Sequence, residues 1–142
     1  MAPESMVHAL EIVHGLLTPA GRLVDLHPSG QPPPLEVRIG RKRYCAGWLR
    51  ETDDYVEYEQ ASAALQSVVQ QGLFAWEEQR TFAFTTYADS LVELQAYLAR
   101  EWQDAVIDDQ VARQIADWLR VVGGEKEISL REVIAISSLR PL

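Results

Sequence analysis

Three residues of this chain are of the types, and in the positions, that suit contact with a ligand: His27, Asp25 and Trp48. His27 directly follows Arg22–Leu26, which we expect to be a short strand, and open α/β sheets bind ligands beyond the carboxyl ends of their strands. At this position the histidine either contacts a ligand or packs against Pro28. Asp25 is either a buried, hydrogen-bonded carboxylate or a charge at the strand edge. Trp48 lies on an expected hairpin, where a large side chain lines either a pocket or an interface between subunits.

Two pairs of adjacent carboxylates, Asp53–Asp54 and Asp108–Asp109, are of a type that binds metal ions or acts in acid–base catalysis. Each pair directly precedes an expected helix, where one carboxylate caps free backbone amides and the helix dipole favours the other. We therefore predict capping for both pairs, and for the segment Trp76-Glu77-Glu78 we predict a solvated face. His8 and His14 do not share a helix face and predict no metal site. The sequence has no Ser-His-Asp order and no phosphate-binding loop, so we predict no catalytic, metal or cofactor residues.

Length and composition predict one globular domain over residues 1–142, because the chain has 142 residues, 47% of them hydrophobic and 24% charged. The net charge of -8 argues against a nucleic-acid partner, which would need a basic face for the phosphates. The one basic cluster, Arg38–Arg43, is expected to form a solvated hairpin turn. No apolar run approaches the roughly 20 residues that cross a bilayer, so we expect no membrane association.

Cys45 is the single cysteine, which excludes an intramolecular disulfide and a cysteine-based zinc site. Between Tyr44 and Ala46 it is expected to be a small buried hydrophobic residue. Residues 1–7 contain neither a basic segment nor a signal-like apolar stretch. We therefore expect a cytoplasmic protein.

The order of the expected elements indicates an α/β fold with a small mixed sheet and about four helices. Strand 22–26 is expected beside the antiparallel strands 80–87 and 127–139, with an added β-hairpin over 35–49. The alternation of apolar residues along the last strand shifts by one position between Leu130 and Val133, which indicates a bulge or a twist. The expected helices cover residues 3–17, 55–71, 91–105 and 110–122.

The segment ALEIVHGLL over residues 9–17, continued by TPAGRLVDLHP over 18–28, carries a resemblance to a known family. It resembles class I S-adenosylmethionine-dependent methyltransferases, in which a helix of pattern A-L-x-E-I-H-x-x-L leads through L-K-P-G-G-R-L into the fifth strand of the sheet. Residues 88–102 resemble the sixth strand and its following helix, and residues 127–141 the long seventh strand. The resemblance therefore covers nearly the whole chain but only the C-terminal half of the family's fold.

The resemblance implies that the half holding the cofactor is missing. In the family, a glycine-rich loop and an acidic residue of the first half bind S-adenosylmethionine, and none of the eight glycines here forms G-x-G after a strand. The chain is expected to begin after the family's fourth strand, which leaves the edge of Arg22–Leu26 unpaired. We therefore expect a homodimer, or a protein partner, to use this edge, and no cofactor unless a complementary half supplies its site.

These observations leave three functional hypotheses. The first is a methyltransferase-like domain that binds a partner or a small molecule and catalyses nothing alone. The second is a split or truncated methyltransferase that is active only with a complementary chain. The third is an unrelated α+β ligand-binding module. We favour the first, in which the isolated chain is not an enzyme.

Overall fold

A computed structural model describes residues 2–142, and the chain divides into two compact units. Unit 1 contains residues up to Gly30, Tyr55–Phe82 and Val133–Leu142, whereas unit 2 contains Gln31–Asp54 and Ala83–Glu132. Strands β5 (Phe74–Ala88) and β7 (Lys126–Pro141) contribute residues to both. In the described part of the chain, no helix is long and apolar enough to cross a membrane.

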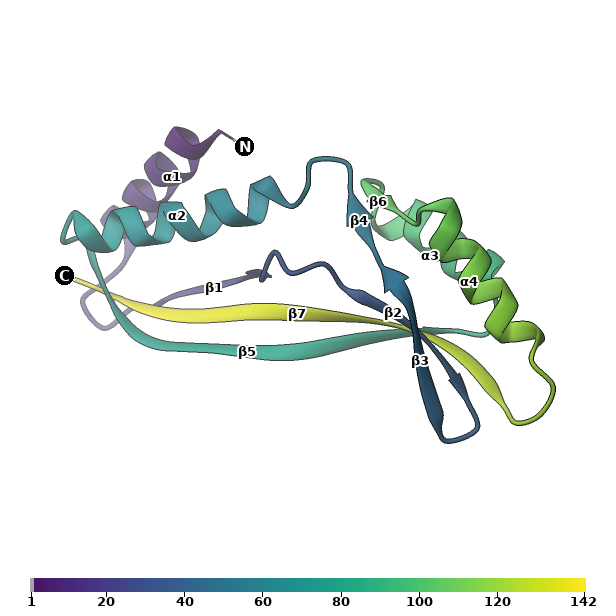
Figure 1. Ribbon diagram of the computed structural model, residues 1–142. Helices are drawn as coiled ribbons and strands as arrows, with labels where there is room; N and C mark the ends of the chain where they lie inside the picture. Colours follow the sequence, from purple (N-terminus) through teal and green to yellow (C-terminus); the bar gives the residue numbers. More distant parts are fainter. Residues whose placement is uncertain (1) are drawn as a thin grey trace. The chain divides into compact units, whose positions relative to one another are not determined.

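Unit 1 is a small sheet with helices on one side (Figure 1). Strand β1 (Leu23–Pro28) pairs antiparallel with β7, from Leu23 opposite Leu139 to Pro28 opposite Ile134, and β5 pairs with β7 as well. Helix α2 (Val56–Gln70) packs on β1, and helix α1 (Pro3–Leu16) packs on α2. The core of the unit therefore lies between the sheet and α2. Its buried residues are Leu65, Val68, Phe74 and Leu139.

Helix α1 is the outermost layer of unit 1, because none of its residues is buried. Its contribution to the core consists of partly buried side chains such as Val7 and Leu10. The C-terminal residue of the chain also belongs to this unit, since Leu142 N donates to the carbonyl of Leu73 at 2.9 Å. The N-terminal helix and the end of the last strand are thus packed in one unit.

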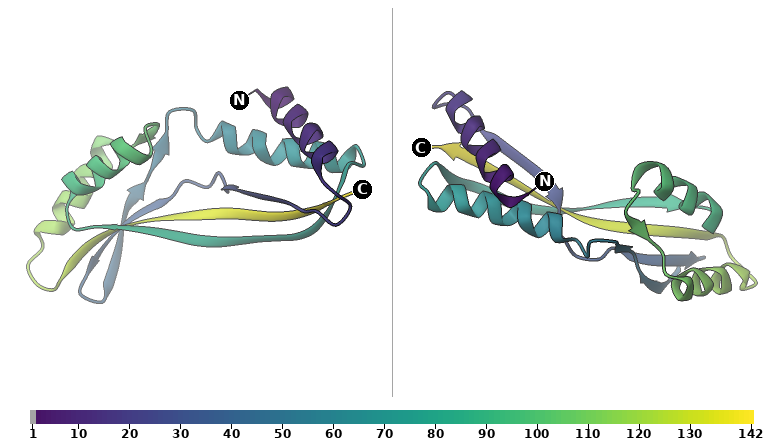
Figure 2. Two further views of the ribbon diagram at one scale, coloured as in Figure 1. Left: turned by 180° about the vertical axis from the view of Figure 1, so that it is seen from behind. Right: turned by 90° about the horizontal axis from the view of Figure 1, so that it is seen from above.

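Unit 2 contains the antiparallel hairpin of β2 (Pro34–Ile39) and β3 (Lys42–Trp48), and β2 also pairs antiparallel with the first residues of β7 (Figure 2). Helix α4 (Asp109–Arg120) packs on β2 and β3 and contacts α3 (Leu91–Glu101). The strands β4 (Arg50–Glu51) and β6 (Ala105–Val106) form a separate antiparallel pair. The most deeply buried residues of this core are Leu35, Val37, Ile115, Ile128 and Leu130.

Two local features explain elements of unit 2. Gly47 lets β3 approach α4 closely, because a Cβ at this position would lie 2.6 Å from Cγ2 of Val111 and the glycine has φ +147°. Helix α3 begins with a side-chain cap, in which Ser90 Oγ accepts from Glu93 N at 3.1 Å, and Glu93 Oε2 accepts from Asp89 N at 2.8 Å.

The α/β class, the four helices, the hairpin and the pairing of β7 with β1 and β5 are as the sequence predicts, whereas the pairing of β7 with β2 was not predicted. The strand pairs β1–β7, β2–β7 and β2–β3 are all antiparallel, so the sheet is mostly antiparallel. The buried residues of β7 change from even to odd positions where its neighbour changes from β2 to β1. Ile128 and Leu130 are buried in the part of β7 that belongs to unit 2. Ser137 and Leu139 are buried in the part that belongs to unit 1.

Truncation of Phe74 should strongly destabilise unit 1. Phe74 is fully buried, so Phe74→Ala should lower the free energy of unfolding by about 3–5 kcal/mol through lost burial and the cavity it leaves. Phe82→Ala is the matched control on the same strand, because Phe82 is 43% exposed and should cost roughly 0.5 kcal/mol. Urea denaturation followed by circular dichroism measures both, and equal losses would contradict the assignment of Phe74 to the core.

Candidate functional site

Asp25 and His27 lie on the face of β1 that α2 covers. Successive side chains of a strand point to opposite faces, so residues two apart share one. In the antiparallel register, Asp25 lies opposite Ser137 and His27 opposite Ala135 on β7. The side chains of Asp25, His27 and Ser137 therefore form a polar floor beneath α2.

A hydrogen-bonded chain of three side chains runs from this floor to α2. The Nδ1 atom of His27 lies 2.5 Å from Oδ2 of Asp25, and its Nε2 atom lies 2.9 Å from Oγ of Ser62. A carboxylate only accepts, so Nδ1 carries the proton, and Nε2 of the neutral ring accepts from the Ser62 hydroxyl. We call Asp25, His27 and Ser62 the relay.

The relay opens on a cavity of about 710 Å³ that lies wholly within unit 1. Ser62, Leu65 and Gln66 stand on one face of α2, at the spacing of one helical turn. The remaining lining residues come from the floor strands and from β5: His27, Trp76, Gln79, Arg80, Thr81, Ala135 and Ser137. His27 is the least accessible member of the relay, since its side chain is only 12% exposed compared with 26% for Asp25, and Ser62 is exposed.

The cavity combines two kinds of surface. Leu65, Trp76 and Ala135 supply apolar contacts, whereas the side-chain amide of Gln66 supplies hydrogen-bond donors. The Arg80 guanidinium adds a positive charge and forms an ion pair with Glu78. Such a cavity suits a small molecule with a flat apolar part and oxygen atoms that accept hydrogen bonds.

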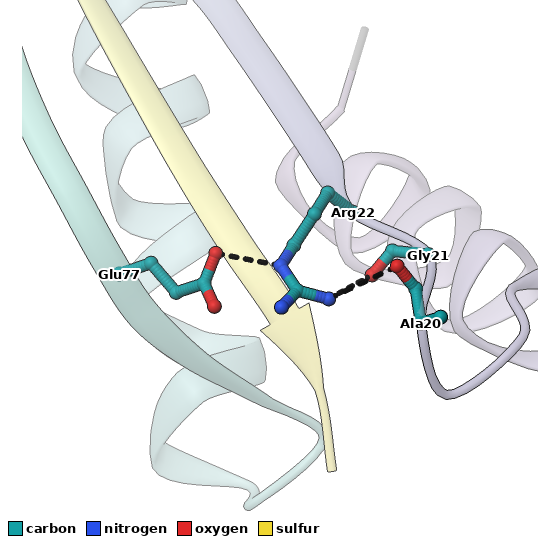
Figure 3. Close-up of polar contacts among 4 residues, drawn as sticks. All are labelled: Ala20, Gly21, Arg22 and Glu77. Carbon is teal, nitrogen blue, oxygen red and sulfur yellow. Dashed lines mark hydrogen bonds and ion pairs between the residues drawn. The ribbon is translucent and has the colours of Figure 1, made fainter.

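The opposite face of β1 carries a different set of residues. Arg22 Nε donates to Oε2 of Glu77 on β5 at 2.6 Å, and Arg22 Nη1 donates to the carbonyls of Gly21 at 2.8 Å and Ala20 at 3.2 Å (Figure 3). Because β7 lies between β1 and β5, this contact joins the two outer strands across the middle one. These contacts hold the guanidinium on the face opposite the cavity, so we assign Arg22 no role in the cavity. Val24 and Leu26 share its face, and both are 55% exposed.

The structure brings together two of the three predicted ligand-contact residues. Asp25 and His27 both belong to the relay, and His27 lines the cavity. Trp48 does not line it, because it is on β3 in unit 2, where it is 59% exposed.

Two sequence predictions about single residues are wrong. Cys45 is exposed on β3, because alternation along the strand turns it to solvent rather than into the core. Trp76, predicted to lie on a solvated face with its acidic neighbours, packs against the core of unit 1 and lines the cavity.

The second pair of carboxylates does not cap its helix as predicted. The N-cap residue of α2 is Tyr55, which has φ 65°, rather than Asp53 or Asp54. Asp108 stands at the start of α4, but its carboxylate binds Arg50 Nη2 at 2.9 Å instead of backbone amides. This hydrogen bond, followed by the charge of Arg50, lowers the pKa of Asp108. Within residues 2–142 no group of three or more His, Cys, Asp or Glu side chains could hold a metal ion.

Ser62 is the site residue that sequence reasoning missed. Asp25 and His27 were detectable, because a separation of two on a strand puts both side chains on one face. Ser62 is 35 residues from His27 along the chain, and only the packing of α2 over β1 brings them together. A serine in the middle of an amphipathic helix carries no local signal for this role.

Comparisons with known protein families, with curated proteins and with solved structures find no match to this chain.

A separate polar cluster lies in unit 2. Glu51 is buried and accepts a hydrogen bond from Trp102 Nε1 at 2.6 Å. Partial burial of Glu132, followed by the nearby charge of Glu51, raises the pKa of the Glu132 carboxyl. In the folded state Glu132 thus keeps its proton to higher pH than in the unfolded chain.

Glu132→Gln should change how stability depends on pH. The folded protein binds more protons than the unfolded chain just above the ordinary pKa of a glutamate, so the free energy of unfolding falls as pH rises through this window. The amide cannot ionise, so the variant should lose this fall and be more stable than the parent at neutral pH. Urea titrations from pH 4 to 8 measure the slope. Exposed Glu125→Gln is the control, and a parental slope in Glu132→Gln would refute the assignment.

Proposed function

We propose that this chain is a methyltransferase-like domain that acts by binding a small polar molecule in the cavity of unit 1 and transfers no methyl group on its own. The observation that carries the proposal is the relay, which fixes the tautomer of His27 and opens on the cavity. An ordered histidine beside convergent donors and an apolar wall is a common arrangement for recognition of a small ligand.

The methyltransferase-like part of the proposal rests on sequence and on strand order. Residues 9–28 resemble the family's helix, turn and fifth strand. Strand β1 lies beside β7, as the fifth strand of that family lies beside the seventh. His27 is the fifth residue of the six-residue strand β1, close to the carboxyl end at which α/β sheets bind ligands.

The lining residues favour a hydroxylated aromatic carboxylate as the ligand class. The ring would pack on Trp76 and Leu65, the carboxylate would accept from Arg80 and Gln66, and the hydroxyl would donate to the relay. We propose a cytoplasmic location for this activity, since the single cysteine excludes an intramolecular disulfide.

Titration with 4-hydroxybenzoate tests the binding proposal. Backbone amide shifts in proton–nitrogen NMR spectra should change at the residues that line the cavity, and benzoate, which lacks the hydroxyl, should bind more weakly. His27→Ala should weaken binding about tenfold, the effect of one lost hydrogen bond. His8→Ala is the matched control, because the His8 side chain is 72% exposed and does not line this cavity. Shifts scattered over the chain, or binding that His27→Ala leaves unchanged, would refute the proposal.

Calorimetric titration with S-adenosylmethionine tests the absence of methyl transfer. The chain has no G-x-G loop after a strand, so we expect no heat of binding at micromolar concentrations. Binding at micromolar strength would contradict the proposal and favour the split or truncated methyltransferase.

Self-association through β1 is a second candidate function, and a separate observation supports it. Among the described residues β1 has one strand neighbour, β7, so its other edge is unpaired, and Val24 and Leu26 are exposed beside it. A second copy is the favoured occupant, because antiparallel pairing of β1 with its own copy about a two-fold axis closes both edges at once.

Leu26→Lys should dissociate this dimer. A lysine would place a charge within the apolar surface that the second copy would cover. Light scattering should give twice the 16.0 kDa chain mass for the parent and the chain mass for the variant. Val122→Lys is the control, because Val122 is 97% exposed in unit 2. A parent that stays monomeric at high concentration would refute association through β1.

A further inference from the structure

We propose that Ser62 is a nucleophile, and that the cavity of unit 1 accepts small carboxylic esters whose acyl group is transferred to its Oγ atom. The inference uses the cavity of the proposed function and goes beyond it, because it assigns a covalent step to the same residues. His27 acts as the general base, and Asp25 is a positioning residue that holds the imidazole.

The geometry of the relay is that of an activated serine. An alcohol becomes nucleophilic when a neutral imidazole nitrogen accepts its proton and a carboxylate holds the other ring nitrogen. Here the contact between Ser62 Oγ and His27 Nε2, at 2.9 Å, lies within the range required of a nucleophile and its base, and the contact between His27 Nδ1 and Asp25 Oδ2 is shorter, at 2.5 Å. The carboxylate also stabilises the imidazolium that forms when Ser62 loses its proton.

The position of Ser62 suits attack on a bound molecule. The residue is exposed on α2 and lines the cavity, whereas the ring of His27 beneath it is largely covered. Ser67 on the same helix gives a direct comparison. Its hydroxyl accepts from Gln71 Nε2 at 3.4 Å, and it does not line this cavity. The environment of Ser62, rather than serine chemistry in general, is therefore what predicts reactivity.

Donors near Ser62 can stabilise the negative oxygen that develops during acyl transfer. Gln66 follows Ser62 by one helical turn on the same face of α2, so its side-chain amide lines the same part of the cavity. Arg80 adds a donor from β5. Such donors lower the barrier when they point at the oxyanion. Trp76 supplies the apolar contact for the acyl or alcohol portion of the ester.

The reaction proceeds in two balanced steps. Oγ of Ser62 bonds to the ester carbonyl carbon while its proton moves to Nε2 of His27, and the carbon–oxygen bond to the alcohol breaks as His27 returns this proton to the leaving oxygen. Water then gives a proton to His27 and bonds to the acyl carbon. The acyl–Oγ bond breaks, and Ser62 regains its proton, which releases the carboxylic acid.

Covalent labelling with an alkyl fluorophosphonate tests the nucleophile. Ser62 Oγ would bond to phosphorus and expel fluoride, so intact-mass spectrometry should show one adduct per chain, and peptide mapping should place it on Ser62. Ser62→Ala should lose the adduct. Ser67→Ala is the matched control on the same helix and should be labelled at the parental rate. An adduct on another residue, or none at all, would overturn the proposal.

Variants of the relay test whether His27 and Asp25 activate Ser62, or whether Ser62 reacts only because it is exposed. His27→Asn should slow labelling at least about 100-fold, the usual contribution of a general base. Asp25→Asn should also slow labelling, because the amide no longer fixes the tautomer. Labelling of the parent should slow at acid pH, where a protonated imidazole cannot accept, and this dependence should vanish in His27→Asn. Circular dichroism confirms that each variant is folded, and a folded His27→Asn labelled at the parental rate would refute activation.

A burst assay with 4-nitrophenyl acetate completes the test. The parent should release one equivalent of 4-nitrophenol per chain rapidly and the rest at the rate of deacylation, whereas Ser62→Ala should show no burst. If 4-hydroxybenzoate binds in a His27-dependent way but Ser62 forms no adduct and no burst, the acyl-transfer proposal fails and the binding proposal stands. If neither binding nor labelling occurs, both fail.

Discussion

The rest of the structure depends on the backbone hydrogen bonding of β7. A central strand buried from solvent must satisfy its amides and carbonyls on both edges, and in β7 different neighbours do so along its length. Its first residues pair with β2 in unit 2, its later residues pair with β1 in unit 1, and β5 is a further neighbour. The change of partner explains why its buried residues switch parity. In unit 1 this pairing fixes which face of β1 meets α2, and so where Asp25 and His27 lie.

Elements with strong local periodicity could be predicted from the sequence. The helices, the β2–β3 hairpin and the last strand were all found, because apolar spacing, turn glycines and prolines are local signals. The short pair β4–β6 could not be found in this way. Arg50 and Val106 pair across more than fifty residues of chain, and neither segment has a pattern of its own. The division into two units was missed for a similar reason, since both are assembled from segments distant in sequence.

The candidate site was half predictable. Position near a strand end singled out His27, and alternation put Asp25 on the same face, but their partner on α2 depends on tertiary packing alone. Trp76 and Cys45 show how a local pattern misleads. Acidic neighbours suggested a solvated Trp76, and a hydrophobic setting suggested a buried Cys45, yet the pairing of their strands decided otherwise. Asp108 shows that a carboxylate at the start of a helix can bind an arginine instead of the helix amides.

The pairing of β1 with β7 also has a consequence for synthesis on the ribosome. Leu23 pairs with Leu139, so β1 finds this neighbour only after more than a hundred further residues have been translated. Until then β1 has neither edge paired, and the segments that line the cavity cannot assemble. The strands β2 and β3 can pair as soon as both have been translated, because they are adjacent in sequence. Contacts between distant segments form slowly, so we expect unit 1 to be the late-folding part of a nascent chain and the part most exposed to chaperones.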